Sequence, residues 1–453
     1  MEAGKKESIE YNAITHGTIW KALILYCLPL ILGNFFQQLY NTADAIVVGR
    51  FVGKQALSAV GGSSAVWVNV FVGLFTGISS GATVIAAQFF GAQQREKLHT
   101  AVHTAIALSL FTGAVLTVLG FLLTPALCRM LDTPADVLGD TVLYLRIFFL
   151  GIVGNLLYNM GSGILRAVGD SRRPLLFLII SCAINIVLDI FFIVVLGLGV
   201  AGAAIATILC QFISACMVLY VLLGTEEPYR LSIGQIRFDQ RMTERILSIG
   251  VPAAVQSLMY TASNLLVQQS INRFGTDYVA AWAAYGKVDM VFWMVNSSFG
   301  VALQTFVAQN YGAGLLARVR KTVRQCSAVM VLWTVPVSIL IYIFGCYAFQ
   351  LFTEDTEVLR IGVRMLRDMT PFYICYLGIE VFSAALRGMG DAMRPMLIDI
   401  LGICVIRVLW LLFVVPAFPE IHTVILSFPI TWILTSTAFL LYYLYYVRKR
   451  KIE

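Results

Sequence analysis

The stretch LRAVGDSRRP at residues 165–174 decides the fold, because it returns as LRGMGDAMRP at residues 386–395. A second stretch, AAQFFGA at residues 86–92, returns as VAQNYGA at residues 307–313. Both pairs are displaced by 221 residues, since 309 minus 88 and 387 minus 166 give the same number. The chain is therefore predicted to be an internal duplication of one structural unit. Near the start of each half the displacement is 223, and it relates Pro29 to Pro252, Asn41 to Asn264 and Arg50 to Arg273.

Composition places both units in a lipid bilayer. Of the 453 residues, 59% are hydrophobic and only 13% are charged, and the mean hydropathy is +0.83. A helix needs roughly 20 apolar residues to cross about 30 Å of hydrocarbon. We expect an all-α integral membrane protein with twelve transmembrane helices. The twelve apolar segments have centres near residues 35, 70, 112, 148, 185, 211, 259, 293, 334, 370, 404 and 433.

The duplication divides these helices into two lobes. We expect an N-terminal six-helix lobe at residues 1–223, a cytoplasmic linker at 224–245 and a C-terminal six-helix lobe at 246–453. Because six crossings return the chain to the side from which it started, the lobes share one orientation and are related by a pseudo-two-fold axis along the membrane normal. Such lobes suit transport by alternating access, although a channel or a structural protein could be duplicated in the same way.

Lysine and arginine are distributed unevenly between the connections. The N-terminus, the even-numbered loops and the C-terminus hold 22 of them, whereas the odd-numbered loops hold 7. An excess of basic residues marks the cytoplasmic side, so both termini are predicted to lie in the cytoplasm, with the protein in the cell inner (plasma) membrane. This asymmetry accounts for the net charge of +7, and we expect no nucleic-acid partner. The polar start of the chain shows no cleavage pattern, so we expect no removable signal peptide.

The stretch NTADAIVVGR at residues 41–50 places a carboxylate, Asp44, inside the first apolar segment. Ionisable side chains within a bilayer need a partner, a water-filled cavity or a function. Asp189 lies eight residues before the turn that joins the fifth and sixth segments, and Thr207 lies eight residues after it. A rise of ~1.5 Å per residue therefore places both about 12 Å below the same surface. Asp44 lies at a similar depth, and Asn185 is one helical turn from Asp189.

These two carboxylates, one amide and one hydroxyl form a set that can hold a proton or a sodium ion. Two carboxylates that share a low-dielectric cavity resist double ionisation unless a cation neutralises them, and hard oxygen ligands suit a hard cation. The alternative is that each aspartate only hydrogen-bonds a neighbouring helix. A purely structural need should recur in both halves, yet the equivalent positions of the second half are Val267, Ile406, Trp410 and Phe428.

Other side chains are candidates for a substrate-binding cleft. Gln37 and Asn41 lie on one face of the first segment, and Gln256 and Tyr260 lie on a matching face of the seventh. Ordinary interhelical hydrogen bonding and core packing are the alternatives for these residues and for the further candidates. Those further candidates are Met259, Met290, Asp289 and Glu380.

Taken together, the motifs resemble those of the multidrug and toxic compound extrusion (MATE) family. NTADAIVVGR, AAQFFGA, LRAVGDSRRP, NIVLD at 185–189 and GLGVAGAAIAT at 197–207 look like family motifs, and the similarity covers essentially the whole chain. The resemblance implies twelve helices in two lobes and antiport of organic, often cationic, compounds against protons or sodium ions. For the branch with a cation site in the N-terminal lobe, it implies the site residues Asp44, Asn159, Asn185, Asp189 and Thr207.

The sequence departs from the family at two places. Ser162 stands where many relatives have asparagine, and the seventh segment lacks the acidic residue of the branch with a sodium site in the C-terminal lobe. We expect a cation-coupled antiporter that exports organic, cationic amphipathic compounds by alternating access and works as a monomer. H⁺ or Na⁺ would be the transported ion, and we expect no cofactor.

Three other functions are open on the residues alone. A flippase for lipid-linked oligosaccharides would use a related scaffold but favours a long cationic cleft. A channel would allow fast downhill flux. An intramembrane enzyme is the third, but His99 and His103 lack the glutamate of an H-E-x-x-H metal motif. We therefore expect no enzyme. The glycines of GLFTGISSG at residues 73–81 lie on one helical stripe, which predicts a close helix contact rather than a nucleotide-binding loop.

Overall fold

The computed structural model describes residues 13–450, and within that range it contains helices and connections but no strand. Twelve helices are long and apolar enough to cross a membrane, which confirms the prediction. The N-terminal half contains α1 (Ala13–His16), α2 (Ile19–Phe51), α3 (Lys54–Gly61), α4 (Ser63–Gly91), α5 (Arg95–Met130), α6 (Ala135–Ala167), α7 (Arg172–Asp189) with its π-helical continuation η1 (Ile190–Val195), and α8 (Gly199–Gly224).

The C-terminal half repeats the pattern with more interruptions. The eleventh membrane span, for example, alternates between α-helical and π-helical segments. The elements are α9 (Gln240–Asn272), α10 (Thr276–Gly312), α11 (Leu316–Gln350), α12 (Thr356–Met369), η3 (Thr370–Phe372), α13 (Tyr373–Gly388), α14 (Met393–Asp399), η4 (Ile400–Val405), α15 (Ile406–Leu409), η5 (Trp410–Val414), α16 (Val415–Ala417) and α17 (Ile421–Lys449).

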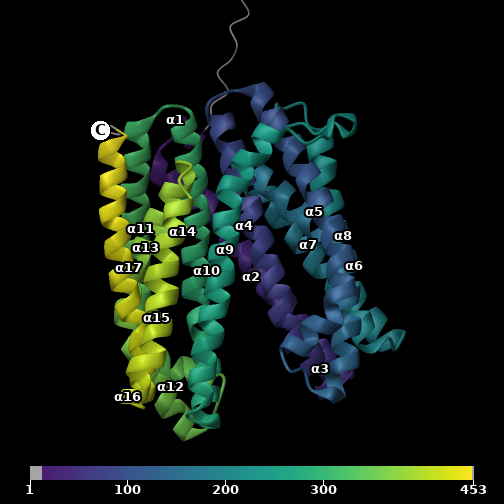
Figure 1. Ribbon diagram of the computed structural model, residues 1–453, viewed down its shortest axis with the longest axis vertical. Helices are drawn as coiled ribbons and strands as arrows, with labels where there is room; N and C mark the ends of the chain where they lie inside the picture. The colour runs from purple at the N-terminus through teal and green to yellow at the C-terminus, as the bar shows by residue number, and fades with distance from the viewer. Residues whose placement is uncertain (1–12, 451–453) are drawn as a thin grey trace, which may run out of the picture.

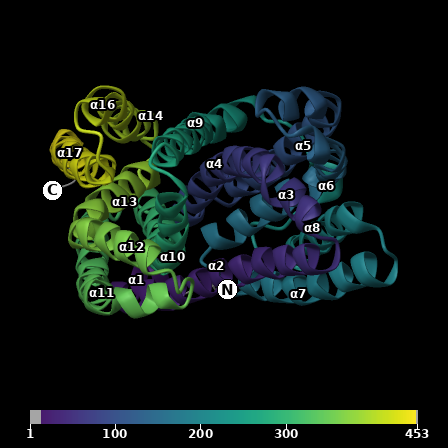
Figure 2. The ribbon, with the colours of Figure 1, turned by 90° about the horizontal axis from the view of Figure 1, so that it is seen from below.

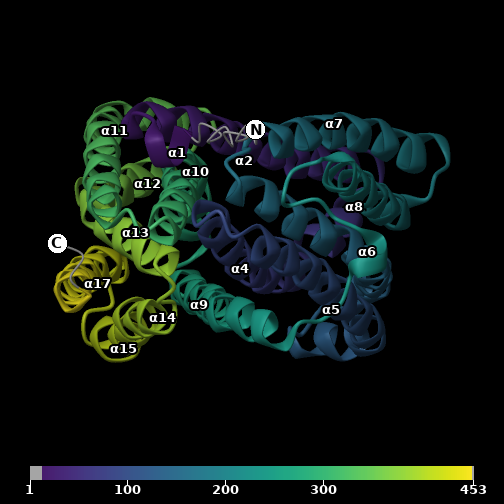
Figure 3. The ribbon, with the colours of Figure 1, turned by 90° about the horizontal axis from the view of Figure 1, so that it is seen from above.

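The two halves form lobes that lie side by side. In Figure 1 the N-terminal lobe, purple to teal, and the C-terminal lobe, teal to yellow, approach each other near α1 and diverge toward α3 and α12. Figures 2 and 3, seen along the long axis, show α2 beside α7 and α4 beside α9. The predicted fold of twelve helices in two lobes is therefore confirmed.

We call the face that carries α1 and the end of α17 the terminal face (Figure 1). Because successive membrane helices alternate in direction, this face also carries the connections 92–94, 168–171, 225–239, 313–315 and 389–392. Three of the basic residues assigned to it, Lys5, Lys6 and Lys451, lie outside the described residues, as do most of the polar residues that precede the first span.

The helices α2 and α9 each contact both lobes. Near the terminal face, Tyr26 of α2 packs edge-on against Phe306 of α10 with ring centroids 5.5 Å apart, and Asn34 donates a hydrogen bond to the Ser298 hydroxyl at 3.0 Å. Farther along, α2 packs on α7 of its own lobe. The helix α9 repeats this arrangement: near the terminal face it packs on α4 of the other lobe, and farther along it contacts α14 and η4 of its own lobe.

Glycine makes the contact between α4 and α9 possible. A Cβ atom at Gly77 would overlap the backbone of Ala254, and one at Gly81 would overlap the backbone of Gly250. The backbones therefore approach as closely as small-residue helix interfaces in membranes allow. The predicted close-packing stripe is confirmed.

The connection between the lobes is held against the N-terminal lobe. The Ser232 backbone N–H donates to His103 Nε2 at 2.9 Å, and the His103 ring lies 3.9 Å from the ring of His99. The helix α9 begins at Gln240 because Asp239 caps it, accepting a hydrogen bond from the Met242 N–H at 2.8 Å. The last residues of the linker predicted at 224–245 are thus the first turns of α9. The two histidines anchor a connection in this structure.

Candidate functional site

Four polar side chains predicted to converge are buried within the N-terminal lobe. Asn185 and Asp189 of α7 are 0% exposed, Thr207 of α8 is 7% exposed and Asp44 of α2 is 8% exposed. Asn185 and Asp189 share a face of α7 because they are one turn apart, and α7 packs between α2 and α8. We call Asp44, Asn185, Asp189 and Thr207 the N-lobe cluster.

Two tyrosines complete the surroundings of the cluster. Tyr40 of α2 and Tyr144 of α6 each lie close enough to Asp44 and Asp189 to interact with them electrostatically, and each lies beside the Thr207 side chain. Asp44 and Asp189 also interact with each other. Neither tyrosine was a sequence candidate. Tyr40 is one helical turn before Asp44, so the spacing that placed Asn185 beside Asp189 could also have predicted Tyr40. Nothing in the sequence places Tyr144 beside α2.

Six of the seven side-chain polar atoms of the cluster are buried without a hydrogen-bond partner among residues 13–450. This is true of both carboxylate oxygens of Asp189, Oδ1 of Asp44, both amide atoms of Asn185 and the Thr207 hydroxyl. Buried polar groups in folded proteins nearly always have a partner, and burying a carboxylate without one is costly. The ion pairs of the described chain include neither aspartate. This set of unpaired oxygens fits a hard cation or a proton.

The helix geometry changes at Asp189. The α-helical hydrogen bonding of α7 ends at this residue, and the chain continues as the π-helical turn η1. π-helical turns often occur at functional sites because the wider turn redirects side chains. A π-helical segment, η5, also begins at the equivalent position of the other lobe, Trp410, so the turn belongs to the repeated scaffold and only the carboxylate is specific to the N-terminal lobe.

The four equivalent positions of the C-terminal lobe carry apolar or aromatic side chains. Val267 is 1% exposed and belongs to the apolar core of that lobe, and Phe428 packs in the same core. The Phe428 ring lies 4.0 Å from the guanidinium of the buried Arg407, which donates to the Thr431 hydroxyl at 3.1 Å. The two lobes thus share a backbone arrangement but carry different side chains at this place: carboxylates in the N-terminal lobe and apolar groups in the C-terminal lobe.

Asn159, the fifth predicted cation ligand, has a different set of partners. Its amide donates to the backbone oxygen of Asn155 at 2.8 Å and to the side-chain oxygen of Asn155 at 2.9 Å. These bonds tie it to the preceding turn of α6. Its participation in cation binding stays a prediction.

Two substrate candidates of α9, Gln256 and Tyr260, take part in a hydrogen-bond network of the C-terminal lobe. Gln256 donates to Asp399 Oδ2 and accepts from Arg387 Nη1 at 3.2 Å, and Tyr260 donates to Asp399 Oδ1 at 3.5 Å. Glu380 lies against Gly300 and accepts from the Tyr376 hydroxyl at 3.4 Å. These pairs could not be predicted from the sequence, because counting residues from a loop gives the depth of a side chain in the membrane but not the helices that lie next to it.

The remaining candidates differ in their access to solvent. Asp289 is buried and accepts hydrogen bonds from the Tyr373 hydroxyl at 2.5 Å and from the Trp293 ring N–H. Of the other four, Gln37 and Asn41 are exposed, and Met259 and Met290 are half-buried. Their contact with substrate stays a prediction.

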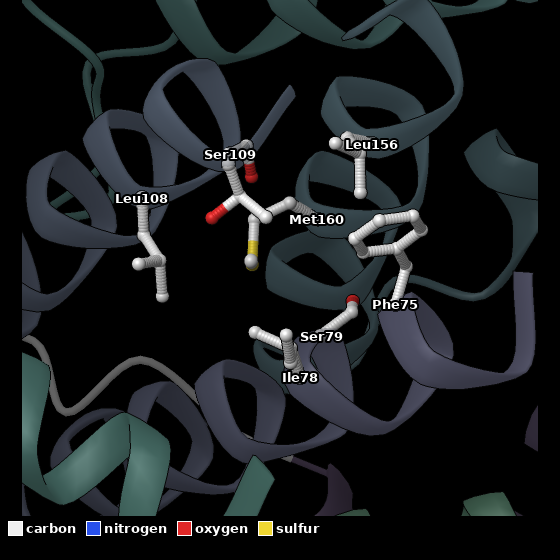
Figure 4. Close-up of a pocket in the computed structure, with 8 residues that line it drawn as sticks. Phe75, Ile78, Ser79, Leu108, Ser109, Leu156 and Met160 are labelled. Carbon is white, nitrogen blue, oxygen red and sulfur yellow. The ribbon is translucent and has the colours of Figure 1, made fainter. Parts of the chain in front are cut away.

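A small pocket lies between α4, α5 and α6, and none of the predicted site residues lines it (Figure 4). Apolar side chains line it, among them Phe75, Leu108, Leu156 and Met160, together with the hydroxyls of Ser79 and Ser109. Charged groups are absent from its lining. We therefore place neither the cation nor the substrate there.

The fold and the cluster together define a class of protein. Two repeated lobes of six membrane helices, with unpaired carboxylates buried in only one of them, are the architecture of a secondary transporter. The chain belongs to the MatE (MATE) family, whose model matches residues 29–191 and 252–412, one match in each half. MATE proteins are membrane transporters and not enzymes.

Relatives cover most of the chain. It is 28% identical over 393 residues to "Probable multidrug resistance protein YoeA" of Bacillus subtilis, covering 85% of both chains. It is 29% identical over 396 residues to "Probable multidrug resistance protein NorM" of Thermotoga maritima, covering 86% of this chain and 84% of that one. It is 24% identical over 461 residues to "FAD transporter" of Shewanella oneidensis, and the match covers 98% of this chain and 97% of that one.

Solved structures share the fold. "Crystal structure of MATE in the bent conformation" matches with a TM-score of 0.91 and 22% identity, covering 98% of this chain and 99% of that one. "Outward-facing conformation of a multidrug resistance MATE family transporter of the MOP superfamily" matches with a TM-score of 0.89 and 22% identity, covering 99% and 100%.

Proposed function

We propose that this protein is a cation-coupled antiporter that exports drug-like organic compounds across the plasma membrane, with the N-lobe cluster as the site that binds H⁺ or Na⁺. One observation carries the proposal. The carboxylates of Asp44 and Asp189 are buried in one lobe with oxygens that lack hydrogen-bond partners in the described chain, and the other lobe has Val267 and Trp410 instead.

The coupling follows from the position of Asp44. A cation that enters from outside neutralises the cluster and changes the packing of α2 against α7. Because α2 also contacts α10 of the other lobe, this change reaches the contact between the lobes. Substrate is then released outward, and the return of the unloaded protein is tied to substrate uptake from inside.

The direction of transport rests on the distribution of basic residues. The terminal face, counted with the helix ends that border its connections and with the two ends of the chain, holds 22 lysines and arginines against 7 on the opposite face. The positive-inside rule assigns the terminal face, and with it both termini, to the cytoplasm. The lobes diverge toward the opposite face in Figure 1, and with this orientation the divergence supports an outward-facing state.

The available energy is sufficient for export without ATP. One charge that moves through 100 mV yields about 2.3 kcal/mol, and a tenfold concentration ratio costs ~1.4 kcal/mol. One net charge per cycle therefore supports a gradient of roughly 40-fold.

The substrate class rests on the names of relatives and on the acidic side chains. Two relatives are called multidrug resistance proteins, which favours varied drug-like compounds. Asp289 and Glu380 favour cationic amphipathic ones. The relative called an FAD transporter makes an anionic nucleotide the alternative class to include in the assay.

The test is transport in proteoliposomes with proton and sodium gradients imposed separately. We expect one of the two gradients to drive uptake of a fluorescent organic cation, and we expect Asp189→Asn to abolish the driven component. Asp136→Asn is the matched control, because Asp136 is an exposed aspartate at the start of α6. Undiminished gradient-driven transport by Asp189→Asn would refute the assigned role.

The same vesicles separate the rival functions. Counterflow of labelled substrate against unlabelled substrate is expected of a carrier and not of a channel. A lipid-linked oligosaccharide flippase would move a fluorescent lipid-linked sugar and would leave the organic cation in place.

A further inference from the structure

We propose that Gln88 and Gln309 form a two-part latch that joins the lobes at the terminal face and must release each time the transporter opens there. The inference rests on the proposed alternating-access function and adds to it the residues that gate one side. Its starting point is the pair of repeated motifs around these glutamines, AAQFFGA and VAQNYGA, to which the coupling site assigns no role.

Each glutamine donates a hydrogen bond across the interface between the lobes. Gln88 of α4 donates from Nε2 to the backbone oxygen of Gly388, the last residue of α13, at 2.9 Å. Gln309 of α10 donates from Nε2 to the backbone oxygen of Ala167, the last residue of α6, at 2.6 Å. We call these four residues the glutamine latch. A displacement of 221 residues relates Gln88 to Gln309 and Ala167 to Gly388, so the two bonds are the same bond made twice.

The acceptors explain why glutamine is suited to this role. The last four carbonyls of an α-helix have no partner within the helix. Each glutamine therefore donates to a backbone carbonyl that has no partner within the helix it ends. This bond can form only while the two lobes are in contact. When the lobes separate, water can form hydrogen bonds with both the glutamine amide and the backbone carbonyl. Each bond therefore makes only a modest contribution to the free energy of lobe closure. These are the energetics that a gate requires.

Two glycines bring the backbones together at the same place. A Cβ atom at Gly91 would overlap the backbone of Gln309, and a Cβ atom at Gly312 would overlap the backbone of Gln88. The same displacement of 221 residues relates these two contacts. Each glutamine thus contributes its side chain to one contact and its backbone to another, and the repeated spacing of glutamine and glycine in both motifs follows from this geometry.

The latch and the N-lobe cluster differ in symmetry. The latch occurs in both halves, as expected for a contact that two related lobes make with each other. The cluster occurs in one half, as expected for a site that binds a ligand. The repeat therefore separates the residues that close the molecule from the residues that bind the cation.

The test measures the distance between the lobes in the absence of substrate and of any gradient. Spin labels at the exposed positions Lys97 and Arg320 of the terminal face report the separation by electron–electron double resonance. The variants are Gln88→Met and Gln309→Met, which keep the side-chain length and remove the donor. We expect each to raise the ratio of separated to closed lobes roughly 3- to 10-fold, with the double variant giving about the product of the two.

Two further variants make the result decisive. Gln94→Met changes an exposed glutamine near the same face and should leave the distances as in the wild type. Gly312→Ala adds a Cβ atom where the backbone of Gln88 lies and should separate the lobes by a different route. Unchanged distances in both glutamine variants would overturn the latch. This readout requires neither a gradient nor transport, so a failure to find gradient-driven transport would overturn the proposed function and leave the latch standing.

Discussion

At the scale of the single residue, Asp189 combines full burial with two carboxylate oxygens that lack hydrogen-bond partners within residues 13–450. Burying an unpaired carboxylate opposes folding. A role in stability therefore does not explain why the residue is there, whereas the proposed binding of a proton or a cation would explain it. This reasoning makes a prediction about stability that is separate from transport.

We expect Asp189→Asn to leave the free energy of unfolding unchanged or to raise it by about 1–3 kcal/mol, because it removes a charge that the fold leaves unpaired. The measurement is thermal unfolding in detergent and sodium-free buffer. Asp399→Asn is the matched control: Asp399 is equally buried but accepts hydrogen bonds from Gln256 and Tyr260, so its loss should cost about 1–2 kcal/mol. A lower unfolding temperature for Asp189→Asn than for Asp399→Asn would contradict this account.

The hydroxyl of Thr207 gives a second prediction at this scale. Thr207→Val keeps the shape and removes an oxygen of the cluster, so the cation concentration that gives half-maximal transport should rise by roughly tenfold. Thr207→Ser keeps the hydroxyl and should stay within about twofold of the wild type. Titration of transport against the coupling cation measures both values. Equal effects of valine and serine would mean that the hydroxyl takes no part.

The sequence indicated the members of the cluster better than their surroundings. Counting residues from the loops placed Asp44, Asp189 and Thr207 at one depth, because helix rise is nearly constant in a membrane span. Counting could not reveal Tyr144, which reaches the cluster from α6, nor the bond between Gln256 and Asp399. Both depend on which helices are neighbours, and that information is not local.

At the scale of the element, α2 and α9 are the helices that contact both lobes. Each contains a proline within its span, Pro29 and Pro252, at positions related by the repeat. Their contacts near the terminal face connect the lobes, and their farther halves pack within a lobe. One continuous helix, α2, therefore connects Asp44 with the contact between the lobes.

The contact between α4 and α9 can be tested by adding a single carbon. We expect Gly77→Ala to destabilise the protein by about 1–3 kcal/mol, because the new Cβ atom would overlap the backbone of Ala254. Gly139→Ala is the control, since that position faces open space. Thermal unfolding of the two variants gives the comparison. Equal stability of both would show that α4 and α9 are not closely packed in solution.

Hydropathy predicted every membrane span but not the breaks within them. The second span begins with a separate helix, α3, that ends beside Gly62, and the eleventh contains two π-helical segments. A hydropathy window averages over these changes because the apolar character continues through them. Hydrogen-bond geometry, which the window does not measure, sets the boundaries.

At the scale of the whole molecule, a symmetric scaffold contains an asymmetric site. The duplicated motifs in the sequence predicted the two lobes, and the structure places those motifs at the contact between the lobes. The pairing itself, Gln88 with Gly388 and Gln309 with Ala167, could not be predicted, because a repeat shows which positions are equivalent but not which positions touch.

Thermodynamic linkage connects the latch to the cluster and gives the last prediction. If the cation binds more tightly to the outward-facing state, its apparent dissociation constant is the intrinsic value divided by the fraction of molecules in that state. Releasing the latch with Gln88→Met and Gln309→Met lowers that fraction, so the apparent affinity for the cation should fall once the separated state predominates. Coupling free energies are reciprocal, so saturating cation should close the lobes of the latch variants again. Spin-label distances with and without the cation measure this closure. The closure should vanish when Asp189→Asn is added, and persistence in that background would place the cation at another site.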